Sequence, residues 1–425
     1  MSAEALSADP AAMPGTEHAR RITIVSGLRI FPCQTGGHLR TGGIALALAR
    51  LGHEVTLYSL AGRQSDYRLA ALFRGGVSRQ RIAPNLVEET NLGLGFGLSQ
   101  TLARRAGYPR FWQYELMRRG LVPSALKAKL QNSDIVISDL PWCPPVPGPW
   151  ARKPWFLISH NLEHRLLEQE QTSARDRRFA AKMRQVEVNA PRLFRDIFVC
   201  AEEDRDFFRH HDPTGRLKLP LIPCGVDPSA YRVAPGTRER VRAELSLSDA
   251  DRVVVFAASR FGPNVEAFAL LEEFCRAQQD LLAREHIRIL VLGSIVESPR
   301  REGALIATGR VPEVAPYFAA ADAGLNPVTR GSGANVKIFE YLAARLPVIS
   351  TVFGVRGTPL RAEQDFLTFD PLQPAQALQR FAQGRTSAQW RSFADSVWQR
   401  HHASCDINEL VQLAIALRPE FGLTE

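Results

Sequence analysis

The hydrophobic residues of the chain follow two alternating patterns. Short continuous runs rich in Val, Ile and Leu are typical of buried strands, and longer stretches with apolar residues every three or four positions indicate helices. In the first half the predicted strands are 21–26, 54–60, 134–139, 155–159, 196–200 and 219–223. The predicted helices of this half are 44–51, 114–130 and 175–194, and the first of them follows a glycine-rich loop.

The second half restarts the same alternation. Its predicted strands are 252–258, 287–293, 323–326, 347–351 and 366–369. Its predicted helices are 264–282, 314–320 and 335–344, and the last stretch, 388–417, is helical without strands. Strands that alternate with helices predict parallel sheets covered by helices on both faces.

The length of 425 residues corresponds to about two or three domains. We predict an α/β protein with two tandem, Rossmann-like, doubly wound domains that face each other across a cleft, with ligands at the carboxyl ends of the strands. Pro, Gly and Ser cluster at 228–236, which places the domain boundary there. The predicted parts are a disordered lead (1–19), an N-terminal domain (20–228), a C-terminal domain (229–395) and a C-terminal helix that crosses back to the N-terminal domain (396–425).

The composition excludes several classes of protein. Hydrophobic residues are 45% and charged residues 23%, the balance of a globular protein with a sizeable core, which excludes a disordered or collagen-like chain. No apolar run approaches the roughly 20 residues of a membrane-spanning helix, and residues 1–19 lack the apolar core of a signal peptide. The six cysteines form no CxxC pair, which argues against a zinc site and a disulfide framework and favours the cytoplasm.

The net charge of +9 favours an anionic partner. A nucleotide-sugar, an anionic membrane surface and a nucleic acid all satisfy this condition, so the charge does not choose among them.

The strongest chemical signal is a glycine-rich turn that opens the predicted helix 335–344. Gly331 and Gly333 let the backbone approach a ligand closely, and the first N–H groups of a helix favour an anion such as a diphosphate. Lys337 adds a positive charge one turn into the helix, and Glu340 follows on the same face, where a carboxylate can accept hydrogen bonds from ribose hydroxyls. These residues alone are equally consistent with a glycine-rich turn and a surface ion pair.

The segment GSGANVKIFEYLAARLPVIST (331–351) resembles the donor-binding segment of glycosyltransferase family 4, the retaining, group 1-type glycosyltransferases of the GT-B fold. Other segments are similar to those of the family, in the same order along the chain: 21–55, Ser159-His160-Asn161-Leu162-Glu163, 222–227, 256–264 and Gly309-Arg310-Val311. The resemblance covers about residues 21–400 and supports the predicted GT-B fold.

The resemblance also implies that the N-terminal domain (20–228) binds the acceptor and the C-terminal domain (229–395) binds the nucleotide-sugar donor. It implies roles for particular residues as well. It implies that His160 holds or polarises the transferred sugar, that Arg260 contacts the diphosphate and that Lys337 binds the phosphates, so these three are the expected catalytic residues. The expected donor-binding residues are Gly36, Gly37, Arg260, Val311, Gly331, Ser332, Gly333, Ala334, Lys337 and Glu340. It implies no metal and no cofactor, because the nucleotide-sugar is a co-substrate and cationic side chains with the helix dipole supply the positive field.

We therefore expect a metal-independent, retaining hexosyltransferase that moves a sugar from a nucleotide-sugar to a hydroxyl of a glycan, a lipid-linked molecule or a small molecule. Ser332 stands where the family has the first glutamate of a pair, which leaves the choice of donor open. The alternatives are a non-catalytic GT-B subunit that binds a nucleotide-sugar, and an epimerase or phosphorylase of the same architecture. A nicotinamide-dependent dehydrogenase is disfavoured, because the first glycine loop, from Gly36 to Gly43, lacks GxGxxG spacing.

One basic segment mixes arginines with aromatic residues: Arg104, Arg105, Arg110, Phe111, Trp112, Tyr114, Arg118 and Arg119. This mixture suits an anionic membrane surface and would also suit nucleic acid, but a solvated basic face with aromatics turned toward the core is the favoured explanation. We expect a cytoplasmic protein that binds peripherally at the inner membrane face and acts in polysaccharide or glycolipid synthesis, and we expect no nucleic-acid partner.

Overall fold

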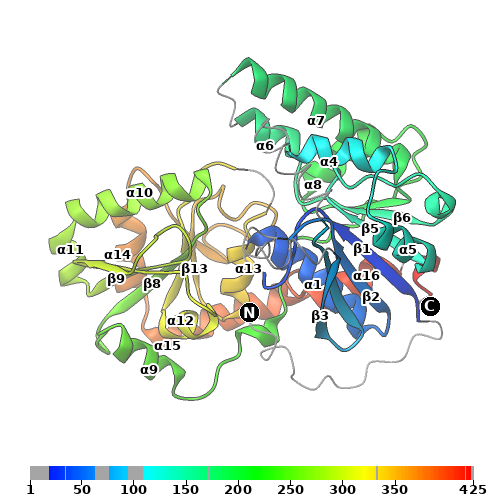
Figure 1. Ribbon diagram of the computed structural model, residues 1–425. Coiled ribbons are helices and arrows are strands. Elements are labelled where there is room, and N and C mark those ends of the chain that lie inside the picture. Colours follow the sequence, from blue (N-terminus) through cyan, green and yellow to red (C-terminus); the bar gives the residue numbers. More distant parts are fainter. Residues whose placement is uncertain are drawn as a thin grey trace. The chain divides into compact units, whose positions relative to one another are not determined.

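The computed structural model describes residues 19–33, 35–62, 76–93, 109–169, 173–331, 334–416 and 418–422. The expected lead lies almost wholly outside these residues. The described residues form two compact units: an N-terminal unit, which ends at Pro223 and regains the chain from Ile407 onward, and a C-terminal unit, Cys224–Asp406. Within the described residues each unit has one seven-stranded sheet (Figure 1).

The N-terminal unit is a doubly wound sheet in the order β3-β4-β2-β1-β5-β6-β7. Its strands are β1 (Arg21–Ser26), β2 (Glu54–Ser59), β3 (Val77–Ala83), β4 (Leu86–Asn91), β5 (Ile135–Asp139), β6 (Trp155–Ile158) and β7 (Asp196–Phe198). Its described helices are α1 (Gly36–Arg50), α4 (Pro109–Arg118), α5 (Ser124–Asn132), α6 (Glu163–Gln169), α7 (Ala174–Leu193), α8 (Glu202–His210) and α16 (Ile407–Ala416), with short 3₁₀ turns η3 (Pro149–Arg152) and η6 (Pro419–Phe421). All neighbouring strands are parallel except the β3–β4 hairpin at one edge.

The C-terminal unit repeats this plan in the order β10-β11-β9-β8-β12-β13-β14. Its strands are β8 (Arg252–Ala257), β9 (Ile287–Leu292), β10 (Arg300–Glu302), β11 (Leu305–Gly309), β12 (Ala323–Asn326), β13 (Val348–Ser350) and β14 (Phe366–Thr368). Its described helices are α9 (Thr237–Glu244), α10 (Gly262–Ala277), α11 (Gln279–Arg284), α12 (Ala315–Ala320), α13 (Val336–Ala343), α14 (Pro374–Gly384) and α15 (Ser387–His401), with 3₁₀ turns η4 (Pro228–Tyr231) and η5 (His402–Ser404). In each sheet the strand order reverses beside the first strand, β1 or β8, and ligands of such sheets bind at the carboxyl ends of the strands at this point.

The strands predicted from apolar runs are confirmed with one exception. Residues 219–223 form only an isolated bridge between Val199 and Leu221. Three predicted helical stretches are divided, and the last of them, 388–417, consists of α15, the turn η5 and α16. The first ends at Arg118, because Gly120 has a φ of 70° and Pro123 precedes α5. The second is interrupted at Gln278, between α10 and α11.

The expected glycine loop before residue 44 is also wrong, since α1 already begins at Gly36. Thr35 caps this helix with its side chain, which accepts a hydrogen bond from the His38 N–H. A Cβ at Gly42 would lie 2.9 Å from the Cys33 Sγ, and one at Gly43 would lie 3.1 Å from Ile407. These glycines therefore serve close packing of the helix rather than an irregular loop.

Strands β3, β4, β10 and β11 were not predicted, and β3 and β10 among them lie at the edges of their sheets. β3 reads VSRQRIA and is largely exposed, and β10 consists of three exposed charged residues. An edge strand that no helix covers has no need of an apolar pattern, and charges on it oppose pairing with another chain.

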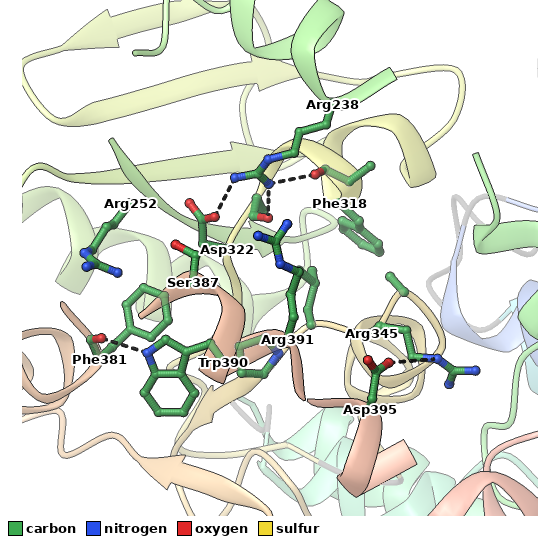
Figure 2. A pocket seen from close by; sticks show the side chains of 15 residues that line it. Arg238, Arg252, Phe318, Asp322, Arg345, Phe381, Ser387, Trp390, Arg391 and Asp395 are labelled. Carbon is green, nitrogen blue, oxygen red and sulfur yellow. Dashed lines mark hydrogen bonds and ion pairs between the residues drawn. The ribbon is translucent and has the colours of Figure 1, made fainter. Parts of the chain in front are cut away.

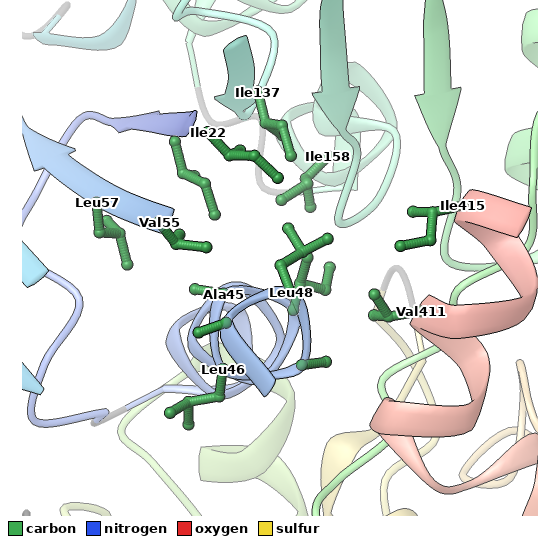
Figure 3. Packing of buried hydrophobic residues seen from close by; sticks show 14 of the residues in the cluster. Ile22, Ala45, Leu46, Leu48, Val55, Leu57, Ile137, Ile158, Val411 and Ile415 are labelled. Atoms are coloured by element: carbon green, nitrogen blue, oxygen red, sulfur yellow. The ribbon is translucent and has the colours of Figure 1, made fainter. Parts of the chain in front are cut away.

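The end of the chain completes the core of the N-terminal unit. Side chains from one face of the sheet pack with α1 and α16, and Figure 3 shows Val411 and Ile415 of α16 directed toward α1. Beyond α16 the ring of Phe421 is fully buried 5.2 Å from that of Phe156, and Arg418 forms an ion pair with Asp196. All six cysteines are free. In the parts of the chain that the structure describes, every helix is too short or too polar to span a bilayer.

We predict that Ile415→Ala lowers the free energy of unfolding by about 3 kcal/mol, because it removes a fully buried side chain and leaves a cavity. Leu413→Ala on the same helix is the matched control, since Leu413 is 64% exposed and its loss should change stability by less than about 0.5 kcal/mol. Urea unfolding of both variants measures the difference. Equal effects would mean that α16 is not part of this core.

Candidate functional site

The site in the C-terminal unit is built around α13, which follows β12 at the carboxyl edge of the sheet. Gly331 in the connecting loop has a φ of 138°, a conformation that favours glycine. Asn335 immediately precedes the helix and donates its side-chain amide to the carbonyl of Gly354 at 2.9 Å. Ser332 and Gly333 lie outside the described residues, and Ala334 is half-buried beside them.

The buried side chain of Tyr341 fixes α13 to the sheet. Its hydroxyl accepts a hydrogen bond from the Ala257 N–H at 3.0 Å and donates one to the Leu325 carbonyl at 3.2 Å, which ties the helix to the ends of β8 and β12. A Cβ at Gly324 would lie 2.3 Å from the Tyr341 ring, so glycine is required for this contact. The helix therefore has a fixed place at the point where the strand order reverses.

Lys337 is buried in the first turn of α13. Its Nζ donates to Oδ1 of Asn264 at 2.9 Å and lies 4.6 Å from the centre of the Phe256 ring. Burial lowers the pKa of Lys337 from 10.5 to about 7, while the nearby Glu340 acts in the opposite direction. The positive charge of Lys337 is therefore only partly compensated by the described residues around it.

Glu340 lies on the same side of α13, and its Oε1 accepts a hydrogen bond from the Tyr231 hydroxyl at 2.9 Å. The Tyr231 ring is held in turn by stacking on Phe318, with an interplanar angle of 8°. Burial raises the pKa of Glu340, and the hydrogen bond from Tyr231 and the charge of Lys337 partly offset this effect. The carboxylate is therefore oriented by residues from two other elements.

Arg260 follows β8 but is arranged differently from Lys337. Its side chain is 66% exposed and forms an ion pair of 2.5 Å with Glu297. Its backbone N–H donates to the Ser294 hydroxyl at 3.3 Å. A Cβ at Gly293 would lie 2.3 Å from the Ala258 carbonyl, so the loops after β8 and β9 pack closely. Val311, the other predicted residue of this edge, is half-buried in the loop after β11.

A second polar group lies at the carboxyl edge of the N-terminal sheet. His160, after β6, places its Nε2 2.8 Å from Oδ1 of Asp139, the last residue of β5. Hydroxyls of Ser26 and Thr41 donate to the two carboxylate oxygens of Asp139, each at 2.7 Å. These hydrogen bonds and His160 outweigh the effect of burial and lower the pKa of Asp139, so this carboxylate is ionised.

Arg40 on α1 holds His160 from the other side. Its guanidinium is fully buried and donates to the carbonyls of Ser159, Phe198 and Ile222 at 2.8, 3.1 and 2.9 Å. Its Nη1 also lies 3.3 Å from Nδ1 of His160. Because Arg40 only donates, Nδ1 accepts and Nε2 carries the proton that Asp139 accepts.

The predicted residues Gly36 and Gly37 form the start of α1 beside this group. A Cβ at Gly37 would lie 3.9 Å from the His160 ring, so the backbone of α1 passes close to the imidazole. After His160 the chain enters α6, whose first N–H groups, of Glu163 and His164, donate to the buried carboxylate of Glu187 at 2.6 and 3.1 Å. Glu187 therefore fixes the direction of the chain after His160.

The structure thus gathers the predicted residues into two groups, one in each unit. Lys337, Glu340 and Gly331 belong to the carboxyl edge of the C-terminal sheet, and His160 and Gly37 belong to that of the N-terminal sheet. The residues that hold them were not predicted as site residues: Ser26, Arg40, Thr41, Asp139, Tyr231 and Asn264. Of these residues, only Asp139 could have been recognised from the sequence, because it is an acidic residue at the end of a largely apolar strand.

The basic segment predicted to contact a membrane is described only in part. Arg104 and Arg105 lie outside the described residues, and the side chains of Arg110, Phe111 and Trp112 do as well. Arg118 and Arg119 are exposed, and each forms an ion pair with Glu115.

Two family models match consecutive parts of the sequence. The model "Glycosyltransferase Family 4" matches residues 36–230, and the model "Glycosyl transferases group 1" matches residues 251–383. The first range contains Arg40, Asp139 and His160, and the second contains Asn264, Lys337 and Glu340. No curated protein matches the sequence.

Solved glycosyltransferases resemble the whole chain. HepE from Anabaena, crystallised with UDP-glucose, is 15% identical with a TM-score of 0.61, over 94% of this chain and 99% of that chain. WaaG, a glycosyltransferase involved in lipopolysaccharide biosynthesis, is 16% identical with a TM-score of 0.59, over 93% and 99%. The α,α-trehalose 6-phosphate synthase from Burkholderia multivorans is 16% identical with a TM-score of 0.61, over 94% and 96%.

At these identities the solved structures establish the fold, which is the predicted GT-B fold with two Rossmann-like domains. The family models extend this result to the kind of protein, because they match segments of the sequence itself. The chain therefore belongs to the group 1 glycosyltransferases.

Proposed function

We propose that this glycosyltransferase moves a sugar from a nucleoside-diphosphate sugar to a hydroxyl acceptor and binds the leaving diphosphate beside α13. One observation carries the proposal. Lys337 and Glu340 are both buried at the carboxyl edge of the C-terminal sheet, and a residue of another element holds each of them. A cation and a carboxylate one turn apart suit the two polar parts of a nucleotide, its phosphates and its ribose.

Lys337 is assigned to the phosphates. Glycosyl transfer leaves negative charge on the nucleoside diphosphate, and a preorganised cation in a site shielded from water stabilises that charge strongly. Since burial holds the pKa of Lys337 near 7, a bound diphosphate would raise this pKa and favour the charged ammonium. The N-terminus of α13, in whose first turn Lys337 lies, adds the positive end of a helix dipole.

Glu340 is assigned to the ribose. Tyr231 donates to its Oε1, which leaves Oε2 to accept hydrogen bonds from sugar hydroxyls. Hydrogen bonds to a charged acceptor are roughly twice as strong as those between neutral groups. Holding the carboxylate through Tyr231 reduces the conformational entropy that nucleotide binding would otherwise cost.

Arg260 is assigned to the diphosphate as well. Its ion pair with Glu297 is exposed on both sides, and such pairs contribute little to stability. The guanidinium can therefore exchange Glu297 for a phosphate at low cost. With Lys337 and the helix dipole it would supply the positive field, which makes transfer independent of a divalent metal.

In the N-terminal unit we assign His160 to the transferred sugar and its surroundings to the acceptor. Both ring nitrogens already have partners, so a sugar hydroxyl would share Nε2–H with Asp139 or contact the ring edge. Asp139 is hydrogen-bonded on both oxygens, which makes it a poor nucleophile. This favours retention of configuration by front-face substitution rather than through a covalent intermediate on Asp139.

A glycan or lipid-linked acceptor is the first choice, because WaaG acts in lipopolysaccharide synthesis. A peripheral membrane location would follow from a lipid-linked acceptor, and Arg118 and Arg119 would contribute to it. The second candidate function is a non-catalytic subunit that binds the nucleotide-sugar, and Ser332 in place of the family's glutamate favours it.

We predict that UDP, the nucleotide bound by HepE, binds this chain and that Lys337→Met weakens binding about tenfold to a hundredfold, since a hydrogen bond to a charged group contributes ~1.5–3 kcal/mol. Glu340→Gln should weaken UDP binding by a smaller factor and affect uridine equally. Arg276→Gln, at an exposed arginine on α10, is the control. Calorimetry with UDP and uridine measures these affinities, and unchanged affinity in both site variants would remove the proposed nucleotide site.

Proton linkage gives a sharper test of the same site. The pKa of Lys337 is about 7 without ligand and should rise when diphosphate binds, so binding at pH 8 takes up a proton. At pH 6 the lysine is already protonated, and this uptake disappears. Calorimetry in two buffers of different ionisation enthalpy measures the uptake, and Lys337→Met removes it while leaving the titration of UDP itself unchanged. Equal uptake in wild type and variant would contradict the assignment of Lys337.

We predict that transfer persists in EDTA, because cationic side chains and a helix dipole replace the metal. Release of UDP from UDP-sugars, with and without hydroxyl acceptors, measures turnover, and NMR of the product gives its anomeric configuration. Loss of activity in EDTA that manganese restores would contradict metal independence. Tight binding of a nucleotide-sugar without turnover on any acceptor would favour the non-catalytic subunit.

A further inference from the structure

A cavity of about 170 Å³ lies in the C-terminal unit, at the edge of the sheet opposite the one that carries Lys337 and Glu340. Its lining includes Arg252, the first residue of β8, Asp322, which immediately precedes β12, and Pro347, which immediately precedes β13. The cavity is therefore at the amino ends of these strands, whereas Lys337 and Glu340 lie at the carboxyl ends. Nothing in the proposed glycosyl transfer uses it.

Positive charge dominates this cavity. Its charged lining residues are four arginines and two aspartates: Arg238, Arg252, Arg345, Arg391, Asp322 and Asp395. One aspartate, Asp322, already accepts three hydrogen bonds. The donors are Arg238 at 2.6 Å, the Val253 N–H at 2.8 Å and the buried Arg242 at 3.5 Å. The other, Asp395, pairs with Arg345 at 3.7 Å.

The remaining two arginines have no counter-charge within the part of the chain that the structure describes. No hydrogen bond or ion pair joins the guanidinium of Arg252 or Arg391 to a described residue. Figure 2 shows the Arg391 side chain extending from α15 toward Arg238 and Asp322, and Arg252 on the other side of Asp322. Like charges gathered at a partly enclosed surface repel each other, and an anion among them relieves the repulsion.

The start of α15 adds to the positive field. Ser387, the first residue of this helix of 15 residues, lines the cavity, so the positive end of the helix dipole lies beside it. The rings of Phe318, Phe381 and Trp390 form the apolar part of the lining, and Trp390 is fixed by its Nε1, which donates to the Phe381 carbonyl at 2.9 Å. The arrangement combines a rigid apolar wall with cationic groups from α9, β8 and α15.

We propose that this cavity is a binding site for a small oxyanion, a phosphate or phosphate monoester in the first place, separate from the nucleotide site. The volume fits, since a protein cavity of about 150 Å³ holds a ligand as large as benzene. Arg252 and Arg391 bind the anion, and Arg238 with Asp322 fixes the geometry around it. The proposal does not depend on the assignment of the donor site.

Inorganic phosphate is the probe, used on the full chain with sodium chloride at equal ionic strength as the reference. Saturating UDP is present throughout, so that phosphate does not act through the nucleotide site. We expect millimolar phosphate to raise the melting temperature by about 3 °C or more, as binding at ten times Kd does for a unit of this size. Arg252→Gln and Arg391→Gln should each abolish most of this rise, while Arg276→Gln and Lys337→Met should keep it.

The outcomes separate the alternatives. No rise above the chloride reference overturns the proposal, and so does a rise that Lys337→Met removes, since phosphate would then act at the nucleotide site. Without phosphate, Arg252→Gln and Arg391→Gln could lower the melting temperature by as much as phosphate raises it. That result would show that the two arginines stabilise the fold, and it would also overturn the proposal. Acetate and a sugar phosphate, tested in parallel, distinguish a general carboxylate site from one that needs a phosphate group.

Discussion

The contact between Tyr341 and the ends of β8 and β12 determines the chemistry of the C-terminal unit. One hydroxyl bonds to both strands, and the ring packs closely against Gly324, so these contacts hold α13 in its place on the sheet. This position buries Lys337 and Glu340, whose charged forms are costly in a protein interior. Asn264 and Tyr231 offset only part of that cost. A ligand with a diphosphate and a ribose would offset the rest, which links the packing of one tyrosine to nucleotide binding.

The two units share a strand order but place different chemistry at the same edge of the sheet. In the N-terminal unit the carboxyl ends of β1 and β5 carry Ser26 and Asp139, and α1 supplies Arg40 and Thr41, so that a carboxylate orients His160. In the C-terminal unit the equivalent edge carries a buried lysine and an exposed arginine. The first arrangement suits neutral hydroxyl groups and the second suits an anion. The proposed transfer from a nucleotide-sugar requires both kinds of group to be bound.

Much of the fold could be predicted because both sheets are covered by helices on both faces. Strands such as β1, β5 and β8 are buried at nearly every position for this reason and contain short apolar runs, and their bounds were found within one or two residues. β3 and β10 were missed because an exposed edge strand needs no apolar side chains. The glycines of α1 were misassigned because close packing against Cys33 and Ile407 outweighs the low helix propensity of glycine.

The sequence by itself determined the two α/β halves, the glycine at position 331 and the cation and carboxylate that follow it, because these depend on local patterns of spacing and polarity. Only the tertiary structure decided which residues hold them. Asp139 and His160 are 21 positions apart, and Tyr231 and Glu340 are 109 apart. Their contacts arise because parallel strands bring distant segments to one edge of a sheet, and no local pattern records which side chains meet there.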